Sequence, residues 1–414
     1  MYDSILDIEA SLEFADEATL CTWLSIRNTV LRDFESQRSG LSANFSFHTD
    51  YNIIKKIKLA FYFFPDVIHL CVRNLTCEDL LIHTGQNKSA IDESVDAFGA
   101  YLTKRGSNYL SISFGRSKLD ADFSFYSIVV ISNLIAGLIS IFLPGKYFHR
   151  IENLLATFDG QSGFECRVPL RYLARKYLAN KILTKCLQIV LGRSLKNIKA
   201  VYLEEGHYQD KSQIVHMLKK HGLSVIEQQH GMVHLNHDAY NYPDKLFEDY
   251  KGFLPDRFLV FDDFWKDLVR IPGNIENIGW YKLGEYQKLY LTISRENRCL
   301  FIGSGLHTKD SISAFNKLRS LHTNLKFYYR PHPSEKQIVQ KLLDSNCIDI
   351  FPLHKSLLVS RYVVGDMSTV LFEAQEMGCK VMGLKSPYLE GTGLDSLVPF
   401  CELAELTTSN FFEG

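Results

Sequence analysis

The sequence predicts an α/β protein made of two doubly wound lobes, each built on a parallel sheet. The first reason is length, because 414 residues exceed one ordinary core and suit two domains of roughly 150 to 250 residues. The second is composition, since 46% apolar and 22% charged residues are typical of a globular chain. The third is that strand-like runs alternate with helical runs from Pro169 onward, which favours parallel sheets covered on both faces.

The part of the chain before about residue 165 gives mixed signals. Strand-like runs occur at Val67 to Val72 and Tyr109 to Phe114, and helical spacing covers Ala10 to Arg32 and Ile53 to Phe64. The segment Ser127 to Leu143 is almost wholly apolar but only just long enough to cross a bilayer, and it contains several polar residues. We interpret it as a buried helix.

Membrane contact is the alternative interpretation of that apolar segment, because basic side chains beside it could meet lipid phosphates. These flanking residues are Arg116, Lys118, Lys146, His149 and Arg150. Across the whole chain, 46 basic and 47 acidic residues leave a net charge of -1. The overall charge therefore does not attract the protein to nucleic acid or to an anionic bilayer. The nine cysteines are scattered without a CxxC pair, and the acidic stretch Met1 to Leu20 lacks signal-peptide features. We therefore expect a reduced compartment, no export and no structural zinc.

From Pro169 onward the expected elements follow a regular order. In the first lobe they are a helix through Leu191, strands Ala200 to Leu203, Ser224 to Gln228, Arg257 to Phe261 and Glu276 to Ile278, and a helix Lys211 to His221. In the second lobe they are strands Cys299 to Ile302, Lys326 to Tyr329, Ser360 to Val364 and Lys380 to Leu384, with helices Ser311 to Leu321, Lys336 to Asp344 and Thr369 to Met377. The polar stretch Tyr281 to Arg298 is the expected linker, which gives lobes of residues 1–284 and 285–414.

Two adjacent carboxylates stand where a ligand of such a sheet would bind. Ligands of doubly wound sheets collect at the carboxyl ends of strands, and Glu204 and Glu205 directly follow a predicted strand. Gly206 then permits a sharp turn. Neighbouring side chains on extended backbone point to opposite sides, so one carboxylate can act as a base while the other braces the loop. A solvated acidic turn is the alternative.

The segment Arg330-Pro331-His332-Pro333 ends a strand of the second lobe. Its prolines fix the backbone on both sides of His332, which holds the imidazole at a set angle. The imidazole can donate to a phosphate oxygen, with Arg330 and the start of the next helix adding positive charge. His332, Pro333 and Arg330 are therefore predicted to bind a phosphate group.

Hydroxyl groups at another strand end of the second lobe complete this prediction. Ser368 or Thr369 is the expected N-cap of a helix, where free amides and hydroxyls make an anion site without lysine. Glu373, one turn later, can accept hydrogen bonds from ribose hydroxyls. The turn that contains Gly303 and Ser304 follows a neighbouring strand and joins the predicted nucleotide and phosphate site.

The run Glu227-Gln228-Gln229-His230-Gly231, with His234 and His237 after it, stands at a strand end of the first lobe. We assign Gln229, His230, Gly231 and His237 to substrate contacts. The histidine spacing matches no zinc pattern. The triplet Asp120-Ala121-Asp122 has the form of a metal-binding motif but lies outside the regular strand and helix order. We therefore expect neither a metal nor another cofactor.

With these positions in place, the chain resembles bacterial sialyltransferases and capsule Kdo transferases, which have the GT-B fold and use CMP-activated acidic sugars. Their acidic-acidic-glycine motif is similar to Glu204-Glu205-Gly206, their His-Pro motif to His332-Pro333, and their Ser-Ser or Ser-Thr motif to Ser368-Thr369. The motifs stand in the same order and cover roughly residues 198–395. The resemblance implies two Rossmann-like lobes that face a central cleft.

The resemblance also implies roles for these residues. Glu204 would be the general base, and His332, Ser368 and Thr369 would bind the CMP phosphate. Residues 1–284 would form the acceptor lobe and residues 285–414 the nucleotide-sugar lobe. The implied partners are a nucleotide-sugar donor and a glycan or lipid-linked glycan acceptor of bacterial capsule, O-antigen or lipopolysaccharide synthesis, in the cytoplasm or at the inner membrane, without nucleic acid.

Three alternatives stay open at this point. A Kdo transferase that retains configuration would need a carboxylate nucleophile, for which Glu204, Glu205 and Asp238 are candidates. A CDP-alditol phosphotransferase of the teichoic-acid type would have similar lobes and a similar serine motif. A non-catalytic protein that binds a nucleotide or a glycan would not need Glu204.

Overall fold

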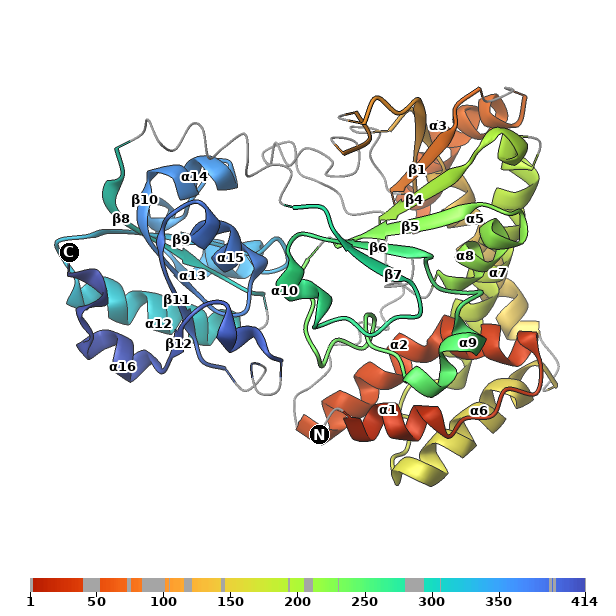
Figure 1. Ribbon diagram of the computed structural model, residues 1–414, viewed down its shortest axis with the longest axis horizontal. Helices are drawn as coiled ribbons and strands as arrows, with labels where there is room; N and C mark the ends of the chain where they lie inside the picture. Colours follow the sequence, from red (N-terminus) through yellow and green to blue (C-terminus); the bar gives the residue numbers. More distant parts are fainter. Residues whose placement is uncertain are drawn as a thin grey trace. The chain divides into compact units, whose positions relative to one another are not determined.

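The chain divides into two compact units in the computed structural model (Figure 1). Of the described residues, those up to Ile278 form unit 1 and those from Gly279 onward form unit 2. The structure describes residues 3–39, 53–72, 76–83, 101–103, 105–114, 121–142, 146–192, 194–204, 211–229, 231–279, 294–305, 307–386, 389 and 392–413. The predicted lobe boundary between residues 284 and 285 lies outside these ranges.

Unit 1 contains a sheet of seven parallel strands in the order β3-β2-β1-β4-β5-β6-β7. The strands are β1 (Asp79–His83), β2 (Tyr109–Ser113), β3 (Phe123–Ser124), β4 (Ala200–Glu204), β5 (Ser224–Gln228), β6 (Arg257–Val260) and β7 (Asn274–Asn277). The chain builds outward from β1 to β3 and then returns to place β4 on the other side of β1. The strand order therefore reverses between β1 and β4, which makes a topological switch point at their carboxyl ends.

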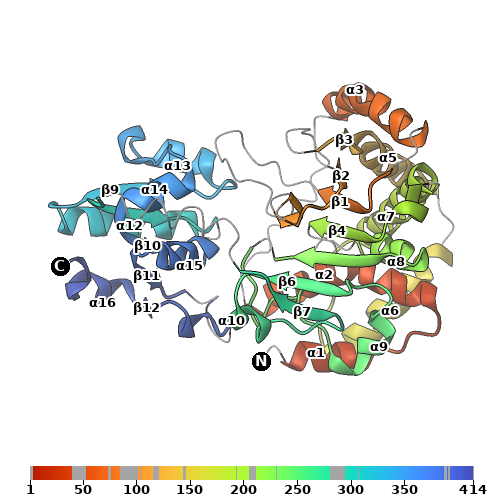
Figure 2. The same ribbon diagram turned by 45° about the horizontal axis from the view of Figure 1, so that its top comes forward.

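Helices cover the faces of this sheet and extend beyond it. They are α1 (Asp3–Ala10), α2 (Glu17–Ser39), α3 (Ile53–Val72), α5 (Tyr126–Phe142), α6 (Lys146–Ser162), α7 (Leu170–Leu191), α8 (Ser212–Lys220), α9 (Phe247–Tyr250) and α10 (Asp263–Lys266), with single 3₁₀ turns at Ser194–Asn197 and Asp244–Leu246. Figure 2 shows α3 beside α5, and α5 beside α7.

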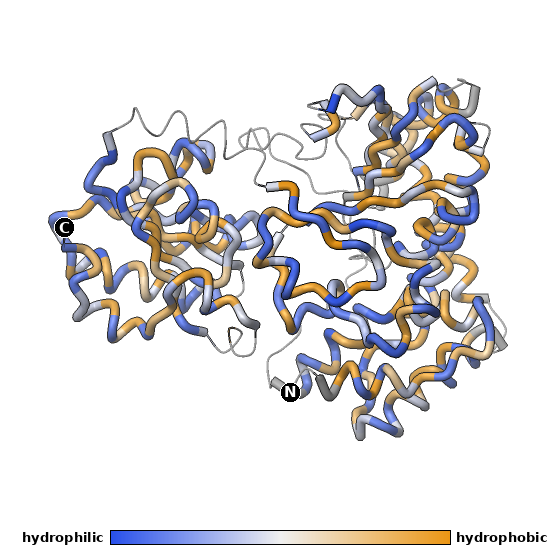
Figure 3. Tube along the Cα trace, in the orientation of Figure 1, coloured by the Kyte–Doolittle hydropathy of each residue, from blue (hydrophilic) through white to orange (hydrophobic). Residues whose placement is uncertain are grey.

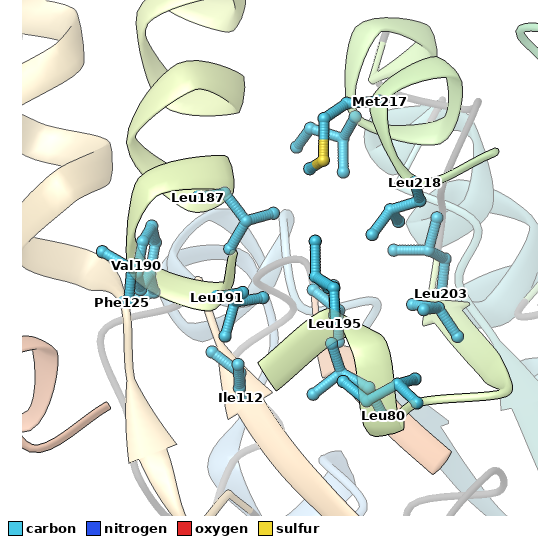
Figure 4. Packing of buried hydrophobic residues seen from close by; sticks show 14 of the residues in the cluster. Leu80, Ile112, Phe125, Leu187, Val190, Leu191, Leu195, Leu203, Met217 and Leu218 are labelled. Atoms are coloured by element: carbon cyan, nitrogen blue, oxygen red, sulfur yellow. The ribbon is translucent and has the colours of Figure 1, made fainter. Parts of the chain in front are cut away.

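The main core of unit 1 lies between the sheet and the helices α3, α5, α7 and α8 (Figure 4). Alternate strand residues supply the sheet side of this core, as the period of two along a strand requires. Val201 and Leu203 belong to it, whereas Tyr202 between them does not. On α7 the contributing residues Leu183, Leu187 and Val190 follow the helical spacing of three and four. The core therefore fixes the register of β4, and with it the position of Glu204 at the strand end.

Unit 2 contains five parallel strands in the order β12-β11-β10-β8-β9. The strands are β8 (Glu296–Ile302), β9 (Lys326–Arg330), β10 (Ser360–Gly365), β11 (Lys380–Leu384) and β12 (Phe400–Cys401). The helices are α12 (Thr308–Leu321), α13 (Lys336–Leu342), α14 (Leu353–Val359), α15 (Thr369–Glu376) and α16 (Leu403–Thr408), with 3₁₀ turns at Ser345–Cys347, Leu394–Ser396 and Asn410–Phe412. The strand order reverses between β8 and β10, so this sheet also has a switch point.

Aromatic rings fill the core of unit 2. Phe301 of β8 stacks on Tyr329 of β9 with ring centroids 5.4 Å apart, and Phe315 of α12 meets Tyr329 edge-on at 5.5 Å. Figure 3 shows the apolar segments that run along the strands of both units. A packed aromatic core thus holds the ends of the strands β8, β9 and β10 in place.

The structure confirms most of the predicted elements after residue 169. The strands β5 and β11 have the predicted bounds, and β4, β6, β8, β9 and β10 differ from prediction by one to three residues at an end. The predicted fold class, α/β with two doubly wound parallel sheets, is confirmed as well. The strand β1 and the helix α14 were not predicted. Each is a short run of residues between polar neighbours, and the hydropathy of so short a run shows no clear period.

For the first part of the chain, one prediction was wrong and another was wrong in part. The predicted strand Val67 to Val72 is the last part of helix α3. Its β-branched residues suggested a strand, but Val67 and Leu70 pack into the core at helical spacing. Most of the apolar segment Ser127 to Leu143 does form a helix, α5, but the helix is buried on one side only: Ile128, Val130 and Ala136 are buried, whereas four large apolar side chains are exposed. No helix within the described ranges is both long and apolar enough to span a membrane.

Candidate functional site

Three loops of unit 2 lie side by side at one edge of its sheet. The register pairs Gly365 of β10 with Ile302 of β8, and Ile302 with Arg330 of β9, so these strands end at the same level. The loops are residues 303–305 after β8, residues 331–335 after β9 and residues 366–368 after β10, and together we call them the unit 2 loop cluster. Because β8 and β10 border the switch point, this is the edge where a doubly wound sheet binds ligands.

Glu335 is the buried centre of the unit 2 loop cluster, with only 1% of its surface exposed. Its Oε1 accepts hydrogen bonds from the His332 amide at 2.9 Å and the Tyr329 hydroxyl at 3.2 Å, and its Oε2 accepts one from the Thr308 hydroxyl at 2.8 Å. A Cβ atom added to Gly303 would lie 1.7 Å from Oε1, so a larger residue at this position would displace the Glu335 carboxylate. Burial and the adjacent carboxylate raise the pKa of Tyr329 far above its usual value. The carboxylate therefore ties the loops after β8 and β9 together.

His332 presents one ring nitrogen as a hydrogen-bond donor. Its Nδ1 accepts the amide hydrogen of Ser334 at 3.3 Å and lies 2.7 Å from the Ser334 hydroxyl. An Nδ1 that accepts must be unprotonated, so the neutral ring carries its proton on Nε2. Loss of hydration lowers the pKa of His332, which keeps the ring neutral at pH 7. A neutral Nε2–H is the form that can donate to a phosphate oxygen.

Gly305 brings the turn after β8 against the imidazole. Its φ of +77° is a left-handed conformation that favours glycine. A Cβ atom there would lie 2.5 Å from the Ser334 hydroxyl and 2.7 Å from His332 Nδ1. The backbone therefore approaches His332 more closely than any other residue type would allow.

The loop after β10 joins the same cluster through Asp366 and Ser368. The Ser304 hydroxyl donates to Asp366 Oδ2 at 3.0 Å, and the Met367 amide donates to Oδ1 at 2.7 Å. Ser368 is the N-cap of α15, where its hydroxyl accepts from the Val370 amide at 3.3 Å. The predicted phosphate-site residues Ser304, Ser368 and Thr369 thus stand at or beside the start of this helix, whose amides favour an anion.

Two residues of the predicted phosphate site have other partners. Arg330 donates from Nη1 to Asp349 Oδ2 at 2.8 Å and to the Phe351 carbonyl at 2.6 Å. Asp349 also binds Arg298 at 2.7 Å, so Arg330 belongs to a buried ion network beneath the loops. Glu373 lies 3.4 Å from the His354 ring. The roles predicted for Arg330 and Glu373, and that of the exposed Pro333, stay predictions.

In unit 1 the backbone of Glu204 ends β4 at the switch point. Glu204 is in register with Gln228 of β5. The preceding pair, Ile82 of β1 and Leu203 of β4, is also in register, and His83 follows on β1. Strand ends on both sides of a switch point are where a ligand of this kind of sheet is bound. The predicted residues Glu205, Gly206 and His230 lie outside the described part of the chain.

The predicted contact residue Gln229 has internal partners. Its side-chain amide donates to the Gly231 carbonyl at 3.0 Å and accepts from the Phe261 amide at 3.2 Å. Only 1% of its surface is exposed. Gln229 therefore holds Gly231 and the end of β6 in place, and its role as a substrate contact stays a prediction.

His237 and Asp238 form the polar part of the loop after β5. His237 Nδ1 accepts the Ala239 amide at 3.3 Å and lies 3.6 Å from Asp238 Oδ1. Burial raises the pKa of Asp238, against the opposing charges of Arg32 and Arg27. Burial also lowers the pKa of His234 to about 4, so that ring is neutral at pH 7.

Arg27 clamps this loop from helix α2. Its guanidinium donates to the backbone carbonyls of Asp238 and Asn241, the latter at 2.8 Å. Glu9 of α1 holds the same guanidinium through both of its carboxylate oxygens, at 2.6 and 2.7 Å. Glu9 also accepts from Tyr250 at 2.7 Å. This fully buried ion pair lets two helices far away in the sequence set the conformation of the loop that carries His237.

Glu35 of α2 shares this environment and was not predicted as a site residue. Burial, with the nearby charge of Asp238, raises the pKa of Glu35 to about 8, and Arg32 and Arg27 oppose this shift. At neutral pH this carboxyl is therefore mostly protonated. Carboxyl groups with such a raised pKa are common in functional sites but also occur in structural networks.

The structure places no candidate metal site within the described ranges, where no group of three or more His, Cys, Asp or Glu side chains could hold an ion. Asp122 of the Asp-x-Asp triplet accepts from the Ser111 amide at 2.8 Å and hydroxyl at 3.0 Å. Its carboxylate therefore anchors the strand β2.

Two units with parallel doubly wound sheets, each with polar residues at its switch point, define the class of this protein as two-unit, Rossmann-like α/β. No family model matches the chain, and no curated protein sequence matches it either.

Solved structures similar to the chain have low similarity values. A UDP-N-acetylglucosamine 2-epimerase from Rickettsia bellii is 9% identical, with 77% of this chain and 81% of that chain covered and a TM-score of 0.41. A glycosyltransferase from Rickettsia africae ESF-5 is 12% identical, with 81% and 90% covered and a TM-score of 0.37. The wall teichoic acid polymerase TagF is also 12% identical, with 92% and 86% covered and a TM-score of 0.41. At these values the likeness supports no statement about activity.

Proposed function

We propose that the chain is a glycosyltransferase of the GT-B type that transfers an acidic 2-keto sugar, of the sialic acid type or Kdo, from its CMP-activated donor to an acceptor hydroxyl. The acceptor is a glycan or lipid-linked glycan of bacterial surface polysaccharide synthesis. The observation that carries the proposal is the unit 2 loop cluster, in which His332, Ser304 and the start of α15 meet at a switch point. These residues belong to the motifs that resemble the CMP-sugar transferases.

The loop cluster has the donors that a departing nucleotide needs. In the proposed reaction the bond between the sugar anomeric carbon and the phosphate oxygen breaks, and negative charge grows on the phosphate. The Nε2–H of His332, the hydroxyls of Ser368 and Thr369 and the positive end of the α15 dipole can stabilise that charge. Removal of one such donor typically lowers the rate by about 10² to 10³. CMP leaves with the electron pair of the broken bond.

Glu204 is the proposed base. Its place at the end of β4, beside the switch point of unit 1, supports this role because that edge is where the first unit would bind a ligand. The carboxylate takes the proton of the acceptor hydroxyl while that oxygen bonds to the sugar carbon. Base catalysis of this kind typically contributes about 10² to 10⁴ in rate. The proposal requires the two switch points to face the same substrate during the reaction.

A panel of activated donors tests the proposal directly. The purified chain is incubated with CMP-sialic acid, CMP-Kdo, CDP-glycerol and a UDP-sugar, each with a lipid-linked glycan acceptor mixture, and nucleotide release is measured. We expect CMP release from a CMP-sugar only. Release of CMP from CDP-glycerol alone would favour the alditol phosphotransferase instead. Binding of CMP without turnover of any donor would favour a non-catalytic binding protein.

Ser304→Ala adds a test of the loop cluster itself. The substitution removes the hydroxyl that donates to Asp366, so the loops after β8 and β10 lose a direct link. We expect weaker CMP binding. Ser320→Ala is the matched control, because Ser320 is exposed on α12 and donates only to the Lys317 carbonyl of its own helix. Equal affinity in both variants would contradict the assignment.

A further inference from the structure

The helices α3 and α5 of unit 1 expose an unusual number of large apolar side chains. On α3 and α5 together, eight such side chains expose between 37% and 75% of their surface. They are Phe61, Tyr62, Phe64 and Ile68 of α3, and Ile135, Leu138, Ile139 and Ile141 of α5. Single exposed apolar residues are ordinary, but eight on two neighbouring helices form a patch of the kind that marks an interaction site. We call this patch the α3–α5 face.

The two helices pack against each other in opposite directions. Asp66 of α3 accepts from the Ser124 amide just before α5 at 2.9 Å, and Phe63 meets Tyr126 edge-on at 6.3 Å. Ala60 and Val130 belong to the same small core, so residue numbers fall along α3 as they rise along α5. Later residues of α5 therefore lie beside the first turns of α3.

This arrangement brings exposed apolar residues near Lys58, an exposed lysine of α3. Tyr126, Val130 and Leu134 form the stripe of α5 that contacts α3, and Leu138 continues that stripe by four residues. Leu138 is 61% exposed, so the stripe leaves the packed region there and reaches the surface. It does so near the first turns of α3, the part of the helix on which Lys58 is exposed.

The charge of the α3–α5 face is one-sided, although the whole chain is nearly neutral. Helix α5 contains no charged residue at all. Asp66 is the one acidic residue of α3, and it is buried and bonded to Ser124. Lys58 is exposed one turn before Phe61 and Tyr62, and Arg175 of α7 lies 3.7 Å from the position of a Cβ atom on Gly137 of α5. Among the described residues of α3 and α5, the exposed side chains thus combine aliphatic and aromatic groups with a cation, and none of them is a carboxylate.

We propose that the α3–α5 face docks the protein onto the surface of a bilayer that contains anionic lipids. Aromatic and aliphatic side chains near the cations of Lys58 and Arg175 match the boundary between acyl chains and negatively charged headgroups. Apart from Asn133, whose amide donates to the Val129 carbonyl of its own helix, the exposed α5 residues are aliphatic and carry no side-chain hydrogen-bonding groups that would select a particular protein partner. No described helix is able to cross a bilayer, so the inference concerns a helix pair that lies on the surface. It does not depend on which sugar the protein transfers.

Vesicle flotation with the full chain tests the inference. The anionic probe is a vesicle of phosphatidylcholine with 30% phosphatidylglycerol. Vesicles of pure phosphatidylcholine are the neutral comparison. We expect binding to the anionic vesicles that weakens as salt is raised, and at least about fivefold weaker binding to neutral ones. The double variant Tyr62→Ser, Leu138→Ser should lose about tenfold or more of the anionic binding. Lys58→Glu should lose roughly fivefold or more.

Ile189→Ser is the matched control. Ile189 is 70% exposed on α7 of the same unit but is not part of the α3–α5 face. All substituted positions are at the surface, and unchanged far-ultraviolet circular dichroism verifies that each variant is folded. Failure of the wild-type chain to bind anionic vesicles, or equal loss in Ile189→Ser, would overturn the inference. So would a concentration-dependent dimer that the double variant abolishes while vesicle binding stays unchanged, because a second copy would then cover the face.

Discussion

Replacement of Glu335 by alanine is expected to destabilise unit 2 and to weaken CMP binding in the same variant. The carboxylate accepts hydrogen bonds from Tyr329, His332 and Thr308. A buried donor left without an acceptor costs about 1–3 kcal/mol. Tyr329 is fully buried, so its unpaired hydroxyl would cost this full amount. Water can reach the half-exposed Thr308 and the loop amide of His332 and can replace the lost acceptor there. We therefore expect a loss of about 2–4 kcal/mol in the free energy of unfolding.

Glu335→Gln is the control for this prediction. The glutamine oxygen can still accept from Tyr329 and His332, and its amide can donate to the Thr308 hydroxyl once that hydroxyl rotates. The loss should then stay below about 1 kcal/mol. Urea unfolding followed by circular dichroism measures both variants, and calorimetric titration measures CMP affinity. The reasoning is refuted if Glu335→Ala is as stable as the wild type, or if the glutamine variant loses as much as the alanine variant.

Three further predictions concern unit 1. Arg27→Met leaves Glu9 buried without its partner and should cost about 3–5 kcal/mol in urea unfolding, with partial recovery in the double variant Arg27→Met, Glu9→Met. The raised pKa of Glu35 stabilises the fold fully below about pH 4.5, and this contribution is lost as pH rises toward about 8. Glu35→Gln should therefore flatten the fall of unfolding free energy between pH 5 and 8, and parallel profiles would contradict the assigned pKa. Glu204→Gln should lower the turnover number by about 10² to 10⁴ while CMP affinity stays within about twofold, and retained turnover would remove the residue from the base role.

The regular part of the fold was predictable because alternation of strands and helices leaves a strong pattern. The strand β11 has buried residues on both faces, so Val381 to Leu384 reads as a short apolar run with clear ends. The first part was harder because an exposed apolar helix breaks the rule that links hydropathy to burial. The end of α3 shows this, since Val67 to Val72 has strand-like composition but helical packing.

The candidate site was predictable only where it sits on strand ends. His332, Ser304 and Ser368 could be located because each follows a recognisable strand, and parallel strands end at one edge. Glu335 was missed, although an acidic residue three positions after His332 and directly before a helix was a usable signal. Arg27 could not be found in the same way, because the two loop carbonyls that its guanidinium binds lie more than 200 residues away along the chain. Only the fold brings them together.

The affinity of CMP for the His332→Ala variant tests the central claim most directly. Loss of a hydrogen bond to a charged phosphate is worth about 1.5–3 kcal/mol, which corresponds to roughly tenfold to hundredfold weaker binding. His149→Ala, which removes an exposed imidazole from unit 1, is the control and should bind CMP like the wild type. We predict that titration calorimetry shows this loss for His332→Ala alone. Equal CMP affinity in the wild type and in His332→Ala would contradict the account.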